Sequence, residues 1–182
     1  MSDSTLSPTQ KQFIESQKMF FVATAPSGSD GHINLSPKGV EGSFIVVDDR
    51  TVAYLDYWGS GIETVAHLRE NGRICIMFCS YGEEPNIIRL HGQGSVIEPN
   101  NPAFPEWRSR FPDLPGARTV ICIELTRVCD SCGFGVPIYD FVSHRTKLTD
   151  CAADWGPERL EQYTREKNSY SIDDLPGIDS LT

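Results

Sequence analysis

A serine and a glutamate three residues apart, Ser60 and Glu63, stand where an apolar run breaks at glycines and a helical pattern begins. This spacing predicts a capping box, in which the serine side chain accepts from the Glu63 amide and the glutamate reaches back. Apolar residues recur behind it at helical spacing until Asn71-Gly72 stops the helix. A helix start that follows a strand exposes unpaired N–H groups and the positive end of the helix dipole. The segment therefore fits either a phosphate site or a capped surface helix without a ligand.

Two further segments carry polar groups that a packed core does not need. Residues 34–39 (NLSPKG) place Lys38 at the end of a short strand, and residues 88–94 (IRLHGQG) alternate polar and apolar side chains. The alternation puts Arg89 and His91 on one face, which is either part of a site or the solvent side of an antiparallel sheet. Gly92 and Gly94 in the same strand indicate a bulge or the close approach of another group.

The six cysteines include one CxxC pair, Cys129 and Cys132. A structural zinc site needs four ligands, and neither a second CxxC nor paired histidines accompany this pair. A redox dithiol usually opens a helix, whereas a glycine-rich stretch follows here. We therefore expect the cysteines to be free thiols without a functional role and expect no metal site. A thiol or metal module centred on Cys129 and Cys132 is the alternative.

Composition limits the classes of partner. The chain has 182 residues, which suits a single domain, and a net charge of −9, which argues against nucleic acid and anionic membrane surfaces. A few local cations can still hold a phosphate against this background. No segment approaches the ~20 apolar residues of a membrane span. The polar start at residues 1–5 resembles no secretory signal, so the expected location is cytoplasmic.

The remaining patterns predict a mainly β chain with flanking helices. A capping box at Ser7 and Gln10 predicts a helix over 8–18, and further helices are expected at 62–71, 104–110 and 157–168. Strand patterns occur at 20–25, 32–37, 42–47, 51–57, 74–80, 87–98 and 119–128. Short turns between them favour an antiparallel sheet closed, or partly closed, into a barrel.

Several of these motifs occur together and in order in one known family. The chain resembles the FMN-binding split barrels, or pyridoxamine 5'-phosphate oxidase-like proteins, in their flavin-nucleotide-binding branch, from about residue 13 to 176. The motifs that carry the resemblance are residues 34–39 (NLSPKG), 55–57 (LDY), 59–61 (GSG), 66–71 (AHLREN), 89–94 (RLHGQG), 131–137 (SCGFGVP) and 167–168 (KN). The resemblance implies one domain over 1–182, with a core at about 8–145. It also implies a six-stranded antiparallel Greek-key barrel, a homodimer, and FMN at the subunit interface.

The resemblance also implies which residues bind the cofactor. The family's phosphate-holding positions fall on Ser36, Lys38, Ser60, Gly61, Thr64 and Arg89. Asp56 and Tyr57 lie where the ribityl chain or the ring edge would pass, and His91 shares the face of Arg89. The paired strand cations of the oxidase are reduced to Lys38, and its arginine and histidine for pyridoxal phosphate are absent, so oxidation of vitamin B6 is not expected.

The functional expectation is an FMN-dependent oxidoreductase acting on a small-molecule substrate. The flavin itself carries the hydride chemistry, which agrees with the lack of an evident acid–base pair, so no catalytic residue is assigned. The second interpretation is a flavin-binding sensor or carrier without turnover. Deazaflavin and haem are alternative cofactors, because both occur on this barrel architecture.

Overall fold

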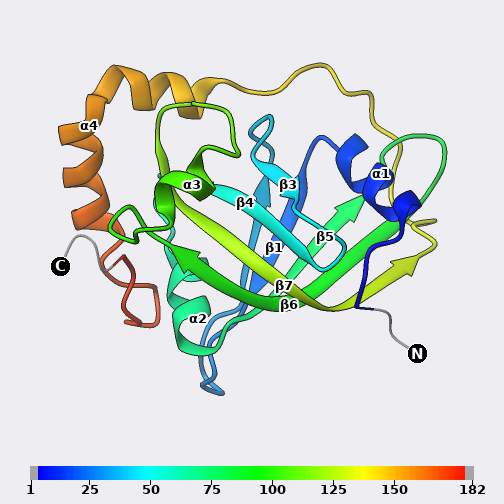
Figure 1. Cartoon of the computed structure of the whole chain (residues 1–182), viewed down its shortest axis with the longest axis horizontal. Coiled ribbons are helices and arrows are strands. Elements are labelled where there is room, and N and C mark those ends of the chain that lie inside the picture. The colour runs from blue at the N-terminus through cyan, green and yellow to red at the C-terminus, as the bar shows by residue number, and fades with distance from the viewer. Residues whose placement is uncertain (1–3, 179–182) are drawn as a thin grey trace.

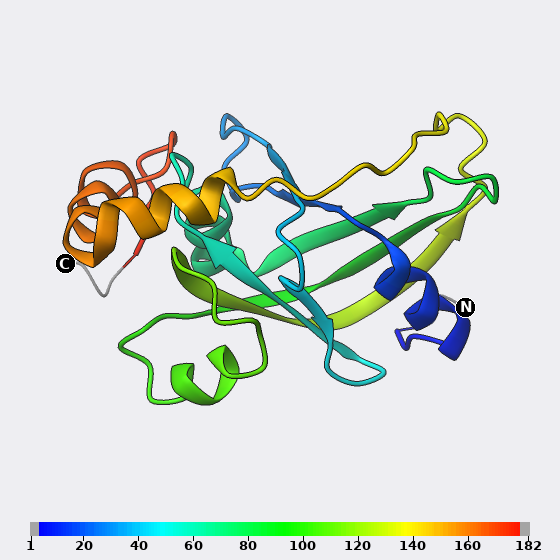
Figure 2. The same cartoon turned by 90° about the horizontal axis from the view of Figure 1, so that it is seen from above.

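One curled antiparallel sheet forms the centre of the molecule (Figures 1 and 2). A computed structural model describes residues 4–178, and in this range seven strands pair in the order β2-β1-β5-β6-β7-β4-β3. The fold prediction is confirmed, with one strand more than the six expected. The strands are β1 (Phe20–Thr24), β2 (Asn34–Lys38), β3 (Phe44–Val46), β4 (Thr51–Tyr57), β5 (Arg73–Cys79), β6 (Ile87–Ile97) and β7 (Ala117–Ser131).

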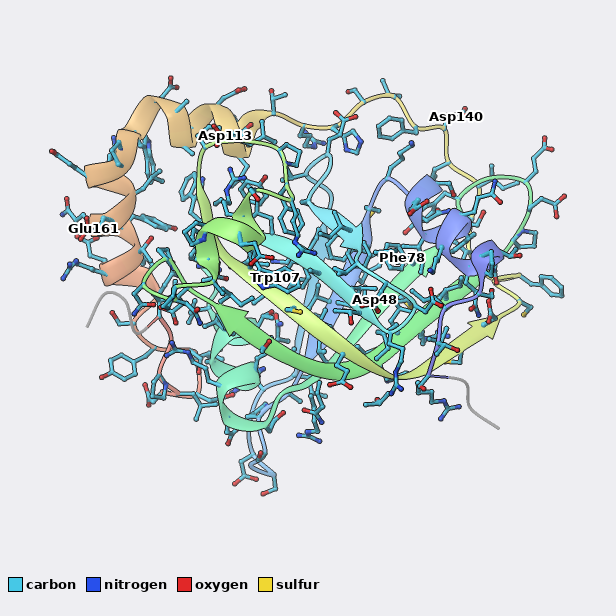
Figure 3. All side chains as sticks on the ribbon, viewed as in Figure 1. Asp48, Phe78, Trp107, Asp113, Asp140 and Glu161 are labelled. Atoms are coloured by element: carbon cyan, nitrogen blue, oxygen red, sulfur yellow. The ribbon has the colours of Figure 1, made fainter. Side chains whose placement is uncertain are left out.

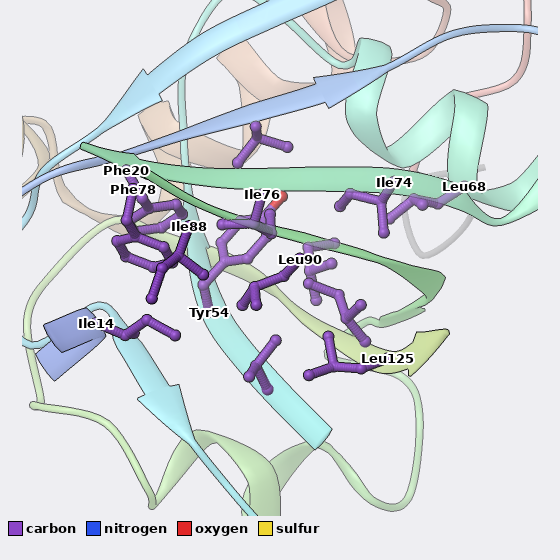
Figure 4. Close-up of a cluster of buried hydrophobic side chains, with 14 of the residues drawn as sticks. Ile14, Phe20, Tyr54, Leu68, Ile74, Ile76, Phe78, Ile88, Leu90 and Leu125 are labelled. Carbon is purple, nitrogen blue, oxygen red and sulfur yellow. The ribbon is translucent and has the colours of Figure 1, made fainter. Parts of the chain in front are cut away.

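Two clusters of apolar side chains hold the sheet. The larger one fills its inner face, where Phe20, Phe44 and Phe78 meet with ring centroids 5.0–5.7 Å apart. Figure 4 shows Phe20 and Phe78 side by side in this cluster. The smaller one packs β4 and β7 against the α3 region through residues such as Phe111 and Trp107. Figure 3 shows the charged Asp113, Asp140 and Glu161 at the periphery instead. Alternate residues of β4 and β7 enter the two clusters, so these strands are covered by apolar side chains on both faces.

Four helices flank the sheet within the described residues. They are α1 (Pro8–Ser16), α2 (Glu63–Asn71), α3 (Phe104–Arg108) and α4 (Lys147–Lys167). The capping box at Ser7 and Gln10 is confirmed, and α2 ends at Gly72 with φ 70°, a left-handed value that favours glycine. Helix α4 consists of two helical stretches that meet at Gly156, whose backbone (φ 71°, ψ 172°) is not helical; the second stretch is the helix predicted from residue 157, and the first was not predicted. No helix among residues 4–178 is long and apolar enough to cross a membrane.

The capping box predicted at Ser60 and Glu63 is wrong. Helix α2 starts one residue after its N-cap, Ile62, and no side chain caps it. The Glu63 carboxylate instead accepts from the backbone N–H of Ile172, at 3.3 Å. The glycines around Ser60 let the loop follow its tertiary partners, and these override the local capping rule.

The bulge predicted near Gly92 is confirmed. The pairing of β6 with β7 shifts register between His91 and Gly92. A Cβ atom on Gly92 would lie 2.4 Å from the carbonyl oxygen of Glu124, so only glycine fits this close approach.

Candidate functional site

A cavity of about 390 Å³ opens where β2, the end of β4 and the start of α2 meet. Its volume falls within the ~300–1,000 Å³ usual for small-molecule sites. Seven of the nine cofactor residues predicted from the sequence line it, together with Arg118, which the sequence reasoning missed. The seven are Ser36, Lys38, Asp56, Tyr57, Ser60, Gly61 and Thr64.

Alternation along β2 directs its polar side chains toward the cavity. Ser36 and Lys38 pair across the sheet with Val22 and Phe20, which are buried in the inner core. The intervening Leu35 is 64% exposed on the opposite face. One short strand therefore supplies a hydroxyl and an ammonium group to the same side.

A buried ion pair forms the floor of the site. The Asp56 carboxylate, 2% exposed, contacts the Arg118 guanidinium at 2.7 Å and the Lys38 ammonium at 3.4 Å. Burial by itself would raise the pKa of Asp56, but the charges of Arg118 and Lys38 outweigh it and hold the pKa below its ordinary value. Asp56 is therefore ionised, and the three groups together carry one positive charge. Lys38 keeps 27% of its side chain exposed and also lines the cavity.

Arg118 and Asn168 fix the loop between β4 and α2. The Arg118 guanidinium donates to the Gly61 carbonyl at 3.2 Å and to the Asn168 amide oxygen at 2.7 Å. The Asn168 amide donates in turn to the Gly59 carbonyl at 3.0 Å. Asn168 is fully buried although it follows the last turn of α4. A side chain from the far end of the chain thereby shapes the loop that lines the cavity.

A chain of hydrogen bonds sets the position of Thr64. The Asn34 amide donates to the hydroxyl oxygens of Thr64 (2.9 Å) and Thr24 (3.0 Å). The Thr24 hydroxyl also lies 2.9 Å from Nδ1 of His67, a fully buried ring whose pKa is lowered by burial. His67 is absent from the cavity wall and stays neutral behind it. Thr64 is therefore presented from a rigid support.

Arg89 and His91 do not line this cavity in the single chain. Arg89 pairs across the sheet with Met77 and Cys129 on the outer face, and its guanidinium donates to the Ser131 hydroxyl at 2.9 Å. His91 Nε2 lies 3.9 Å from the Cys75 sulfur on the same face. The sheet thus separates both residues from Lys38, which faces inward.

The cysteines are all free thiols. Cys129 lies on β7 with its sulfur 3.8 Å from the Arg89 carbonyl oxygen, and Cys132 is exposed just beyond the strand. Over residues 4–178, no group of three or more His, Cys, Asp or Glu side chains is arranged to hold a metal ion.

Comparison with known proteins agrees with this architecture. Residues 6–132 match the family model described as pyridoxamine 5'-phosphate oxidase. The chain is 41% identical over 193 residues to the pyridoxamine 5'-phosphate oxidase family protein ustO of Aspergillus flavus, covering 97% of this chain and 77% of that protein.

Two solved structures share the fold. A candidate pyridoxamine 5'-phosphate oxidase from Lactobacillus delbrueckii matches with a TM-score of 0.56 and 17% identity, over 71% of this chain and 99% of the other. HupZ from Group A Streptococcus matches with a TM-score of 0.52 and 21% identity, over 74% of this chain and 99% of the other. The matched family model and the ustO relative together show that the chain belongs to the pyridoxamine 5'-phosphate oxidase family.

Proposed function

We propose that the protein binds FMN in the cavity between β2 and α2 and acts as an oxidoreductase on a small molecule. The observation that carries this proposal is the set of donors gathered there. Lys38, Ser36, Ser60 and Thr64 all line the cavity, next to the start of α2. Cations and hydroxyl donors near a helix start are the groups that bind a phosphate ester. When bound, the flavin supplies the hydride chemistry.

The residues of the cavity then have separate roles. Lys38 neutralises the phosphate, and the hydroxyls orient it. Gly61 lets the backbone approach the ligand closely. Asp56 and Tyr57 border the path of the ribityl chain, and Asp56 also holds Lys38 in place at 3.4 Å. Binding of an anion draws Lys38 from a long contact with Asp56 into a charge-assisted bond.

A homodimer accounts for the two predicted residues that the single chain leaves outside. The outer side of β2 and the segment after β7 expose large apolar side chains, among them Ile33 (80%), Leu35 (64%) and Phe134 (81%). Isolated exposed residues are ordinary, but Ile33 and Leu35, two positions apart along the chain, together expose apolar surface that favours an interface. A two-fold partner covering this face would bring its Arg89 and His91 toward the cofactor of the first chain.

The test is the identity and affinity of the bound chromophore. We expect the purified protein to be yellow, and the cofactor that it releases on denaturation to have the mass of FMN. Riboflavin should bind at least about tenfold more weakly than FMN. Lys38→Ala should weaken FMN binding by roughly tenfold to a hundredfold, since a charge-assisted bond is lost. Lys167→Ala, on the exposed end of α4, is the matched control. Equal affinity for riboflavin and FMN would contradict the assignment of a phosphate site here. Release of haem or deazaflavin would show that the cofactor is that molecule and not FMN.

A flavin-binding sensor or carrier is the second candidate. Of the two carboxylates in the wall, Asp56 is paired with Arg118 and Glu63 accepts from the backbone N–H of Ile172, so each already has a structural partner. Sustained consumption of NADH or NADPH under air by the FMN-loaded protein would establish turnover. A single stoichiometric reduction without turnover would favour the carrier.

A further inference from the structure

A second and larger cavity, of about 750 Å³, adjoins the first. The two share the wall formed by residues 37–40, Trp58 and Leu148. Its outer side is formed by the strap, which we define as residues 132–146, and by the first turns of α4. Figure 2 shows the strap running along the molecule from the end of β7 to α4. A ligand in this cavity would therefore lie directly beside a cofactor in the first.

The second cavity is cationic although the whole chain has a net charge of −9. Its lining residues include Lys18, Arg145 and Lys147 in addition to the shared Lys38, and among the described residues no Asp or Glu belongs to its wall. Lys38 already faces Asp56, so the charge free to meet a ligand comes mainly from the other three. Such a local concentration of cations attracts an anion against the background of the molecule.

The rest of the wall is apolar and aromatic. Trp58, Phe141 and Leu148 contribute to it, and the Lys18 ammonium lies 5.8 Å from the centre of the Phe141 ring. His144 holds the strap in place through its Nδ1, 2.9 Å from the carbonyl oxygen of Gly39. The strap is thereby fastened to the segment after β2, and its Phe141 lies in the cavity wall beside Lys18.

We propose that this cavity binds the substrate, and that the substrate is a planar or aromatic small molecule bearing a carboxylate or another anionic group. The aromatic wall takes the ring, and Lys18, Arg145 and Lys147 take the anion. The assignment of this ligand as the substrate rests on the proposed function, because it places the ring next to the flavin. The ligand class itself rests on the cavity alone.

Calorimetric titration of the FMN-saturated protein with two matched probes tests the class. Indole-3-acetate and indole-3-acetamide share one ring system and differ in charge. We expect the acetate to bind roughly tenfold to a hundredfold more tightly. Binding of the two probes within twofold of each other, or of neither, overturns the proposal.

Variants locate the site. Arg145→Gln with Lys147→Gln should weaken indole-3-acetate by about tenfold and leave the acetamide within twofold. Arg159→Gln with Lys167→Gln removes two charges from α4 outside both cavities and should change the affinity for neither probe. Phe141→Ala should weaken both probes alike, since it removes part of the aromatic wall. Unchanged affinity for the acetate in the Arg145 and Lys147 variant overturns the proposal.

The FMN content of each sample, measured by its visible absorbance, separates this proposal from the proposed function. If the protein binds no FMN but still binds indole-3-acetate more tightly than the acetamide, the flavin function is refuted and the anion-binding cavity is supported. If the protein binds FMN but binds both probes with the same affinity, the flavin function is supported and the anion-binding cavity is refuted.

Discussion

Replacing Asp56 by asparagine should destabilise the fold through Arg118. The carboxylate is 2% exposed and the guanidinium 8% exposed, so Asp56→Asn leaves a buried positive charge without its counter-charge. Breaking a buried pair in this way costs about 3–5 kcal/mol. Arg118 keeps its acceptors on Asn168 and Gly61, so we expect the lower end, about 3 kcal/mol. For a protein of this size that corresponds to a fall in Tm of roughly 6–12 °C.

Urea unfolding followed by tryptophan fluorescence measures this loss. The matched second variant is Asp56→Asn with Arg118→Met, in which both charges are removed and an apolar chain of similar length remains. We expect the double variant to lose less stability than the sum of the two single variants by at least about 1 kcal/mol. The reasoning fails if Asp56→Asn unfolds within about 0.5 kcal/mol of the native protein, the range of an ordinary surface substitution.

The same pair predicts a pH dependence. The folded-state pKa of Asp56 lies below its ordinary value of 3.8, because Arg118 and Lys38 outweigh the effect of burial. As the pH falls, the unfolded chain therefore takes up this proton first. The stabilisation is complete above about pH 5 and is lost as the pH falls through the folded-state pKa. The stability difference between the native protein and Asp56→Asn should stay constant above about pH 5 and shrink as the pH falls further, and a constant difference down to about pH 3 would contradict the assignment.

Three further predictions concern the site and the assembly. Asn168→Ala should break the hydrogen bonds of Asn168 with the Gly59 carbonyl and the Arg118 side chain. The affinity for FMN, measured by equilibrium dialysis, should fall several-fold, whereas Asn100→Ala at an exposed position should leave it unchanged. Leu35→Glu should convert a dimer into a monomer, as measured by sedimentation velocity, because it places a charge on the exposed outer side of β2. If the native protein with FMN bound is already a monomer, the proposed dimer is excluded. Cys129→Ser with Cys132→Ser should keep a full complement of chromophore, and loss of a stoichiometric metal in that variant would instead support the thiol or metal module.

Local patterns in the sequence were sufficient for most of the sheet. Strand β4 spans the predicted residues 51–57, Gly72 ends α2, and Gly92 marks the bulge, each for a reason that acts within a few residues or between adjacent strands. The fold class follows from such patterns together with the family resemblance. Seven of the predicted cofactor residues meet in one cavity because their motifs all fall at the ends of strands next to α2.

The part that sequence reasoning missed depends on distant contacts. Arg118 bonds to Asp56 across 62 positions and to Asn168 across 50, and no local pattern connects these three residues. The available signal was an arginine at the start of an apolar strand, which must find an acidic partner when it is buried. The Ser60 cap failed for the same reason, since the Gly61 carbonyl is directed to Arg118 instead of a regular capping turn. Whether Arg89 and His91 approach a cofactor depends on how a second chain packs against the first, and this cannot be predicted from patterns within one sequence.

The anchoring of Gly59 by Asn168 also orders events during biosynthesis. These residues are 109 positions apart, and every strand of the sheet precedes Asn168 in the chain. A nascent chain can pair its strands once β7 has left the ribosome, but the loop beside the cavity gains its contact with Asn168 only after residue 168 emerges. If the cavity binds FMN as proposed, loading would be a late step, and a ligand that binds the finished cavity would protect the C-terminal segment from proteolysis by mass action.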